Sequence, residues 1–86
     1  MAVGEQETLS VKVRFFAHYR ERAGERSREV DLPAGSTVGD LLRALAGQGT
    51  ELPGEASVAV NHAYAGRDEA LSDGDEVAFI PPVSGG

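Results

Sequence analysis

The chain has 86 residues, a formal net charge of −6, 41% hydrophobic residues and no cysteine. A length this far below ~150 residues predicts one domain, and we expect a two-layer fold that encloses no deep substrate cavity. The absence of cysteine excludes a disulfide framework, a thiolate zinc site and a persulfide carried on the chain itself. The acidic charge argues against a protein that binds the phosphates of nucleic acid.

The charge is unevenly distributed along the chain. Six of the eight basic residues lie between Lys12 and Arg28, whereas residues 51–86 contain seven acidic residues and one arginine. This asymmetry suits a partner protein with a basic docking surface. The polar, acidic first ten residues do not resemble a signal peptide, and no apolar run approaches the ~18–20 residues that cross a bilayer. We therefore expect a soluble, cytoplasmic protein that does not bind membranes.

The first predicted element is a strand over residues 9–17. Val11, Val13 and Phe15 alternate with polar residues, which is typical of a strand with one buried face. Phe16 is the anomaly, because it falls on the polar face. A short helical turn over 18–24, ended by Gly24, and a charged edge strand over 26–32 follow.

A helix is predicted after the break at residues 33–35. Thr37 and Asp40 have the spacing of a capping box, which marks the helix start. The apolar residues then recur at helical spacing and form one stripe, which consists of Val38, Leu41, Leu42, Leu45 and Ala46. Gly47 and Gly49 close the helix.

The remaining predicted elements are short strands. A strand over 57–60, a two-residue turn at Asn61 and His62, and a return strand over 63–65 form a hairpin. A turn over 72–75 precedes a last strand over 76–80, in which Ala78 and Ile80 face away from the core. A hairpin, one main helix and a last strand beside the first predict an α+β fold, the β-grasp, with a mixed sheet crossed by that helix.

Familiar catalytic and metal-binding motifs are missing. The chain has two histidines, His18 and His62, on different elements and without the HExxH spacing of a zinc site. We interpret His62 as a solvated turn residue. No metal site is predicted, and Ser84 has no base partner that would make it a nucleophile.

Three exposed apolar residues are more informative. Phe16, Tyr64 and Ile80 are expected on the helix-free face of the sheet, rimmed by Lys12 and Arg14. Each alone is an ordinary exposed hydrophobe. Together on adjacent strands they predict a surface that binds a partner.

The C-terminal residues suggest where chemistry takes place. Pro81 and Pro82 end the hydrogen bonding of the last strand, and Val83, Ser84, Gly85 and Gly86 follow. Residues 82–86 span about 16 Å at ~3.3 Å per residue when extended. Such a tail can enter a narrow channel and present the carboxylate of Gly86, which reacts once it is activated, for instance as an acyl-adenylate. An ordinary frayed end is the alternative interpretation.

The C-terminal block, LSDGDEVAFIPPVSGG over residues 71–86, resembles the small subunit of molybdopterin synthase, the MoaD-type sulfur carriers. VRFFA at 13–17, with Arg20, Glu21 and Gly24 after it, and VAVN at 58–61 are similar to that family as well. The resemblance covers residues 11–86. It implies a ubiquitin-like β-grasp domain over 11–82, a flexible Gly-Gly tail over 83–86, and a flexible N-terminal extension over 1–10.

The resemblance also implies a function in molybdenum cofactor biosynthesis. In that family an E1-like enzyme uses ATP to adenylate the terminal glycine, and a sulfur donor system converts it to a thiocarboxylate. The tail enters the large synthase subunit, which holds most of the substrate pocket, and the sulfur passes to cyclic pyranopterin monophosphate. By position, Gly86 carries the sulfur, Gly85 keeps the tail slim, and Phe16, Tyr64 and Ile80 dock the partner. The implied activity is that of a sulfurtransferase subunit with no permanently bound cofactor.

Three alternatives remain open from the residues. A sulfur carrier of the thiamin pathway shares the fold and the Gly-Gly chemistry. A protein modifier joins other proteins through isopeptide bonds, and Lys12, the only lysine, would be its single internal attachment point. A β-grasp binding module with an inert tail is the third. Intact mass after incubation with activating enzyme, ATP and a sulfur donor distinguishes these classes.

Overall fold

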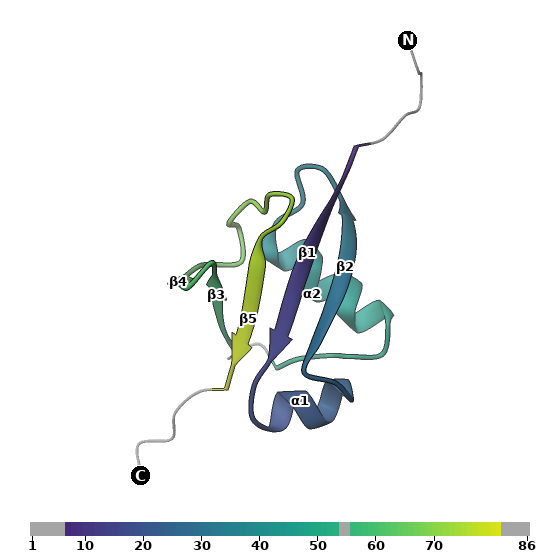
Figure 1. Ribbon diagram of the computed structural model, residues 1–86, viewed down its shortest axis with the longest axis vertical. Helices are drawn as coiled ribbons and strands as arrows, with labels where there is room; N and C mark the ends of the chain where they lie inside the picture. The colour runs from purple at the N-terminus through teal and green to yellow at the C-terminus, as the bar shows by residue number, and fades with distance from the viewer. Residues whose placement is uncertain (1–6, 54–55, 82–86) are drawn as a thin grey trace.

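A computed structural model describes residues 7–53 and 56–81, and five strands lie in this part of the chain. They are β1 (Thr8–Phe15), β2 (Ser27–Pro33), β3 (Ser57–Val60), β4 (Ala63–Tyr64) and β5 (Glu76–Ile80). The strands form one mixed sheet in the order β2-β1-β5-β3-β4 (Figure 1), with β1 and β5 parallel and the other pairs antiparallel. The last strand therefore lies beside the first, as the sequence predicts.

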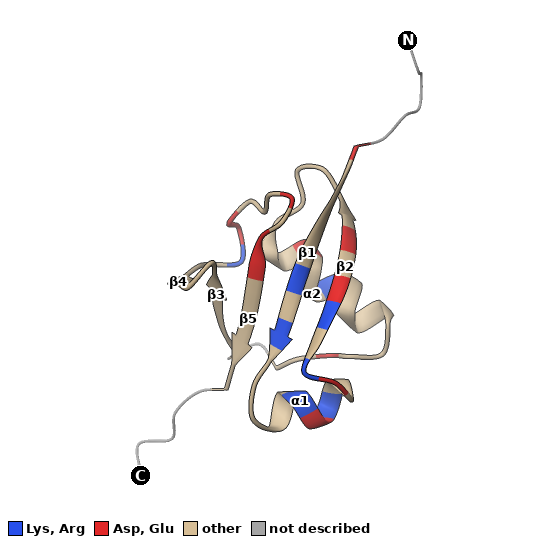
Figure 2. Ribbon diagram, in the orientation of Figure 1, with Lys and Arg blue, Asp and Glu red and all other residues tan. Residues whose placement is uncertain are grey.

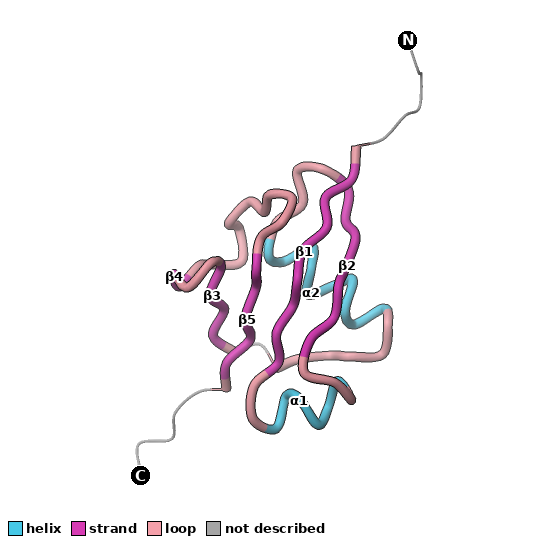
Figure 3. The backbone as a smooth tube through the Cα atoms, in the orientation of Figure 1, coloured by secondary structure: helices cyan, strands magenta, loops and turns pink. Residues whose placement is uncertain are grey.

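Two helices accompany the sheet in the described residues. Helix α2 (Val38–Gly47) covers one face, and the short helix α1 (His18–Ala23) lies at the end of the sheet where β1 and β5 finish (Figure 3). No helix in the described part of the chain is long and apolar enough to span a membrane. The mixed sheet with its two helices confirms the predicted α+β architecture. The face of the sheet opposite α2 is free of described helices (Figure 3).

Strand β1 shows the predicted alternation but not the predicted limits. Val11, Val13 and Phe15 are buried, as expected, in the core cluster that also contains residues of α2. The strand begins at Thr8, and Leu9 pairs with Leu32 and is only 5% exposed. Residues 8–10, which the resemblance assigned to the N-terminal extension, thus belong to the sheet, because Leu9 continues the apolar alternation into the core.

The chain turns sharply between β1 and α1. Phe15 is the last strand residue, two positions earlier than predicted, and Ala17 has φ 54° and ψ −134°, a region that residues other than glycine rarely adopt. Helix α1 ends at Gly24, whose φ of 81° is the predicted left-handed cap. The turn leaves Phe16 at the surface beside the end of the sheet.

Arg28 of the edge strand β2 ties α1 to the segment after α2. Its guanidinium donates to the carbonyl oxygen of Ala23 at 3.1 Å and to Thr50 Oγ1 at 3.1 Å, and it also pairs with Glu25. The same group lies 5.5 Å from the centre of the Phe15 ring. One half-buried arginine thus links the end of α1 to the segment after α2 and to the ring of Phe15.

The predicted capping box begins α2. Thr37 Oγ1 accepts a hydrogen bond from the Asp40 N–H, and the Thr37 N–H donates to Asp40 Oδ2 at 2.9 Å. This hydrogen bond and a second one from Arg43 hold the pKa of Asp40 below its ordinary value. Three residues of the predicted stripe are fully buried, namely Val38, Leu41 and Leu45. Leu42 is half-buried, whereas Ala46, at the margin of the stripe, is exposed.

Removing this cap should lower stability measurably. Thr37→Ala is expected to reduce the free energy of unfolding by about 1 kcal/mol, the usual cost of losing an N-cap side chain, and urea unfolding measures the loss.

The stability that Asp40 contributes should depend on pH. Because folding depresses the pKa of Asp40, its ionised form stabilises the fold at neutral pH, and that contribution is lost as the pH falls below about 4. Urea unfolding of wild type and Asp40→Asn should therefore differ at pH 7, and the difference should shrink in acid.

The second half of the chain follows the predicted order. Asn61 and His62 have φ values of 51° and 73°, which is a type I′ turn that joins β3 to β4 in a tight hairpin. Gly74, with φ 87°, supplies the turn before β5. In β5, Val77 and Phe79 face the core, while Ala78 and Ile80 face the helix-free side.

Candidate functional site

The helix-free face of the sheet contains a shallow hollow. Arg14 lies opposite Ala78 across β1 and β5, Ala78 lies opposite Ala59 on β3, and Ala59 lies opposite Tyr64 on β4. Directly opposite residues point to the same face of a sheet, so these four side chains form one row across it. In this row the two small alanine side chains lie between the long side chains of Arg14 and Tyr64. The resulting depression of about 340 Å³, here called the sheet hollow, is lined by Arg14, Phe16, Ala59, His62, Tyr64, Glu76, Ala78 and Ile80.

The structure brings together the three residues predicted to bind a partner. Phe16 is 41% exposed and Tyr64 80% exposed, and these are the large hydrophobic side chains most accessible to solvent in the described chain. Ile80 is half-buried. All three line the sheet hollow, although Phe16 directly follows β1, Tyr64 belongs to β4 and Ile80 to β5. Their placement on one face is thus as predicted, and their role stays a prediction.

A second, more open depression extends the hollow towards the end of β5. It measures about 410 Å³ and is lined by Phe16, Ala17, Ile80 and Pro81. Phe16 and Ile80 are shared by both depressions, so apolar surface continues from β4 to Pro81, the last described residue. The other predicted tail residues, Pro82, Val83, Ser84, Gly85 and Gly86, lie outside the described residues.

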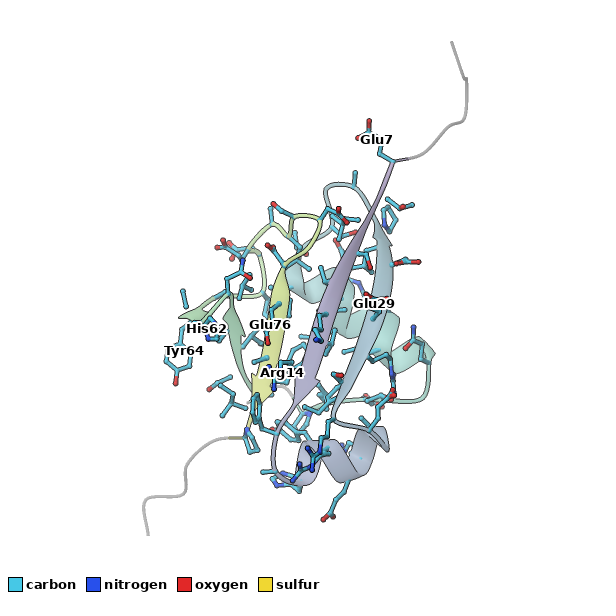
Figure 4. All side chains as sticks on the ribbon, in the orientation of Figure 1. Glu7, Arg14, Glu29, His62, Tyr64 and Glu76 are labelled. Carbon is cyan, nitrogen blue, oxygen red and sulfur yellow. The ribbon has the colours of Figure 1, made fainter. Side chains whose placement is uncertain are left out.

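An ion pair borders the sheet hollow. Arg14 Nη1 lies 2.8 Å from Glu76 Oε2, and this hydrogen bond lowers the pKa of the Glu76 carboxyl, with smaller contributions from His62 and Lys12. Figure 4 shows Arg14 and Glu76 on neighbouring strands, with His62 and Tyr64 on the hairpin beside them. The Arg14 guanidinium also lies 5.8 Å from the centre of the Phe16 ring. A charged pair thus fixes the edge of an apolar surface.

The charges around this face alternate in sign. On β1, Lys12 pairs in register with Glu29 of β2 on one side and Glu76 of β5 on the other, and Figure 2 shows basic and acidic residues side by side on these three strands. Arg14 borders the sheet hollow as predicted, but Lys12 is not among the residues that line it. The rim of the sheet hollow thus contains charged side chains of both signs, Arg14 and Glu76.

Part of the lining of the sheet hollow was not predicted from the sequence. His62, interpreted as a solvated turn residue, is exposed but also lines the sheet hollow together with Glu76, Ala59 and Ala78. The outward direction of Ala78 was readable from the alternation in β5. The alignment of Ala59 with Ala78 depends on the pairing of strands that are distant in sequence, and no local pattern reveals it.

The fold and this face define a ubiquitin-like β-grasp protein with an exposed apolar surface on the helix-free side of its sheet. A ubiquitin of Caldiarchaeum subterraneum, at 16% identity and a TM-score of 0.65 over 93% of this chain and all of that one, shares the fold. The model of the ThiS family matches residues 13–86, and the chain belongs to that family.

Relatives of known name cover almost the whole chain. The molybdopterin synthase sulfur carrier subunit of Escherichia coli is 42% identical in an alignment 83 residues long, which covers 88% of this chain and 99% of that protein. Small archaeal modifier protein 3 of Haloferax volcanii is 36% identical and covers 91% of this chain and 100% of its own length. The family thus includes proteins named as sulfur carriers and proteins named as modifiers.

Solved structures show the same two kinds of relative. SAMP1 from Haloferax volcanii has a TM-score of 0.76 at 39% identity, over 90% of this chain and 99% of that one. A chain in the complex of subunits 1 and 2 of the molybdopterin-converting factor from Helicobacter pylori has a TM-score of 0.66 at 26% identity, over 91% of this chain and 100% of that one.

Proposed function

We propose that this protein is the sulfur carrier subunit of molybdopterin synthase. The observation that carries the proposal is the 42% identity to the Escherichia coli sulfur carrier subunit over 99% of that protein. Relatives with the same name in Chlamydomonas reinhardtii and Mycobacterium tuberculosis are 39% identical. The family match extends through Gly86, the residue that the sequence predicts to carry the sulfur.

The proposed chemistry uses the carboxyl group of Gly86. An E1-like enzyme joins this carboxylate to the α-phosphate of ATP and releases pyrophosphate. A sulfur nucleophile at the oxidation level of sulfide then forms the carbon–sulfur bond and expels AMP, which leaves a thiocarboxylate. In the synthase, that sulfur bonds to a side-chain carbon of cyclic pyranopterin monophosphate and displaces an oxygen substituent. Water cleaves the acyl–sulfur bond and restores the carboxylate, and two rounds supply both sulfurs of the dithiolene.

The sheet hollow and its extension are proposed to dock the large subunit. Phe16 and Ile80 line both depressions, and Pro81, from which the tail continues, lines the second. A partner that covers this surface therefore binds next to the start of the tail. The complex of two converting-factor subunits, one of which matches this chain, supports such a partner. In this arrangement most of the substrate pocket belongs to the large subunit, and the carrier functions in the cytoplasm.

Filling the hollow should block docking. Ala78→Leu places a larger side chain at the centre of the sheet hollow, and we expect its affinity for the large subunit to fall at least about tenfold, which corresponds to 1.4 kcal/mol. Ala46→Leu, at an exposed position of α2, is the matched control and should bind normally. Calorimetric titration measures both. Wild-type affinity of Ala78→Leu would show that docking does not use the hollow.

The proposal is tested by reconstitution. The thiocarboxylated protein, mixed with the large subunit and cyclic pyranopterin monophosphate, should form molybdopterin in proportion to the carrier supplied. A carrier that serves thiamin formation instead would accept sulfur but form no molybdopterin here. Failure of thiocarboxylated protein to yield product would contradict the proposed function.

A second function has specific support. Two relatives, at 36% and 39% identity, are named small archaeal modifier proteins. In that function the activated Gly86 acylates a lysine of another protein and forms an isopeptide bond. Lys12, the only lysine of this chain, lies on the helix-free face opposite Glu76, so its acylation would place a second chain beside the sheet hollow. Conjugates on other proteins after activation without a sulfur donor would favour the modifier.

A further inference from the structure

The turn between β3 and β4 is fastened to β5 by one side chain. The Asn61 carboxamide accepts a hydrogen bond from the Glu76 N–H at 3.0 Å and donates to Asp75 Oδ1 at 2.9 Å. The Asn61 N–H also donates to the Glu76 carbonyl oxygen at 2.8 Å. Asn61 thus engages both backbone groups of Glu76 and extends the pairing of β3 with β5 by one residue beyond Val60 and Val77.

Both partners of Asn61 are themselves held in place. Asp75 accepts from the Ser72 N–H at 2.8 Å, which closes the turn before β5. The side chain of Glu76 pairs with Arg14, whose guanidinium lies against the Phe16 ring. Polar contacts therefore run without interruption from the hairpin turn to Phe16 on the opposite side of the sheet hollow.

The hairpin itself has few other attachments. Strand β4 has two residues and pairs only with Ala59 and Val60 of β3 among the described residues, and the hairpin continues with one hydrogen bond from the Ala65 N–H to the Val58 carbonyl oxygen. Both β4 residues are exposed, so burial does not hold them. His62 and Tyr64, two of the residues that line the sheet hollow, depend on this short hairpin for their position.

From these contacts we infer that Asn61 is a positioning residue, which holds the β3–β4 hairpin against β5 and thereby places His62 and Tyr64 for docking. Its role in docking rests on the proposed function, whereas its role in holding the hairpin does not. Asparagine suits both requirements, because it tolerates positive φ and its amide offers a donor and an acceptor. Glycine would satisfy only the requirement for positive φ, because it has no side chain that donates or accepts.

Amide hydrogen exchange tests the positioning role without a partner. In Asn61→Gly, which keeps the positive φ, the Ala65 amide is expected to exchange about tenfold faster, corresponding to a tenfold larger open population. Asn61→Asp should act in the same direction, because a carboxylate cannot donate to Asp75. Asp73→Ala is the matched control, since it removes one hydrogen bond of 2.7 Å, from the Ser10 N–H, at the same end of the sheet. Ala65 exchange that stays at the wild-type rate in both Asn61 variants would overturn the inference.

Binding to the molybdopterin synthase large subunit tests the docking role. Asn61→Gly should weaken the affinity about tenfold, because the apparent dissociation constant rises as the competent hairpin becomes less populated. In a double variant that already carries Tyr64→Ala and His62→Ala, adding Asn61→Gly should lower the affinity little further. If Asn61→Gly lowers the affinity equally in wild type and in this double variant, the docking role is overturned. If wild type itself does not bind the large subunit, the proposed function fails, and the exchange experiment still decides whether Asn61 positions the hairpin.

Discussion

Deletion of Gly86 is expected to abolish molybdopterin formation. The reactive carboxyl would move back by one residue, which is ~3.3–3.6 Å in an extended chain. A misplacement of about 1 Å can already cost 10²-fold in rate, so we expect a loss of at least that size. Product formation from cyclic pyranopterin monophosphate, with the variant first exposed to the activating enzyme and the sulfur donor, measures the effect.

Extension of the chain by one residue after Gly86 is the matched variant. It should be equally inactive, because the activated carboxyl then belongs to a different residue. The described core cluster extends from Leu9 to Phe79, so the melting temperature of both variants should stay close to that of wild type. Binding to the large subunit should persist through the sheet hollow. Normal turnover without Gly86 would show that the C-terminal carrier mechanism is wrong for this protein.

Phe16→Asp is expected to weaken binding to the large subunit strongly and to leave the fold intact. Phe16 is 41% exposed and lines both depressions, so a partner that covers them buries its ring. Losing a buried aromatic anchor costs at least ~2 kcal/mol of binding energy, which is about 30-fold in affinity. Calorimetric titration with the large subunit, together with a thermal melt of the free variant, gives both quantities.

Phe15→Ala should show the opposite behaviour. Phe15 is 3% exposed and stacks on Phe79 at 6.5 Å between ring centres, and the Arg28 guanidinium lies against it. Its truncation leaves a cavity and should reduce the free energy of unfolding by roughly 3–5 kcal/mol. Under conditions where the variant is folded, binding should be nearly normal. A lowered melting temperature for Phe16→Asp with unchanged affinity would mean that the two faces are assigned the wrong way round.

Those parts of the fold that depend on local signals could be predicted from the sequence. Thr37 and Asp40 form the predicted capping box, and Gly24 adopts the predicted left-handed cap. The alternation in β1 identified Phe15 as a core residue and Phe16 as an exposed one. In each case the sequence pattern spans only a few residues. It reflects either a local hydrogen bond or the direction in which the local backbone points a side chain.

Features that depend on the register between strands could not be predicted. The sheet hollow exists because Ala59 and Ala78 are in register, although they lie on separate strands. His62 belongs to the hollow because Asn61 fastens the turn to β5, a contact 15 residues away in sequence. Thr8, one residue before the predicted start of β1, joins the strand through its pairing with Pro33 at the end of β2. Such contacts become visible only when the register of the sheet is known.

The most direct test of the account is the intact mass of the full chain after incubation with an E1-like activating enzyme, ATP and a sulfur donor. We expect a mass increase equal to the replacement of one oxygen by one sulfur, located by fragmentation to Gly86, and no increase when ATP is omitted. An unchanged mass, or an added sulfur located at any other residue, would contradict the claim that Gly86 carries the sulfur.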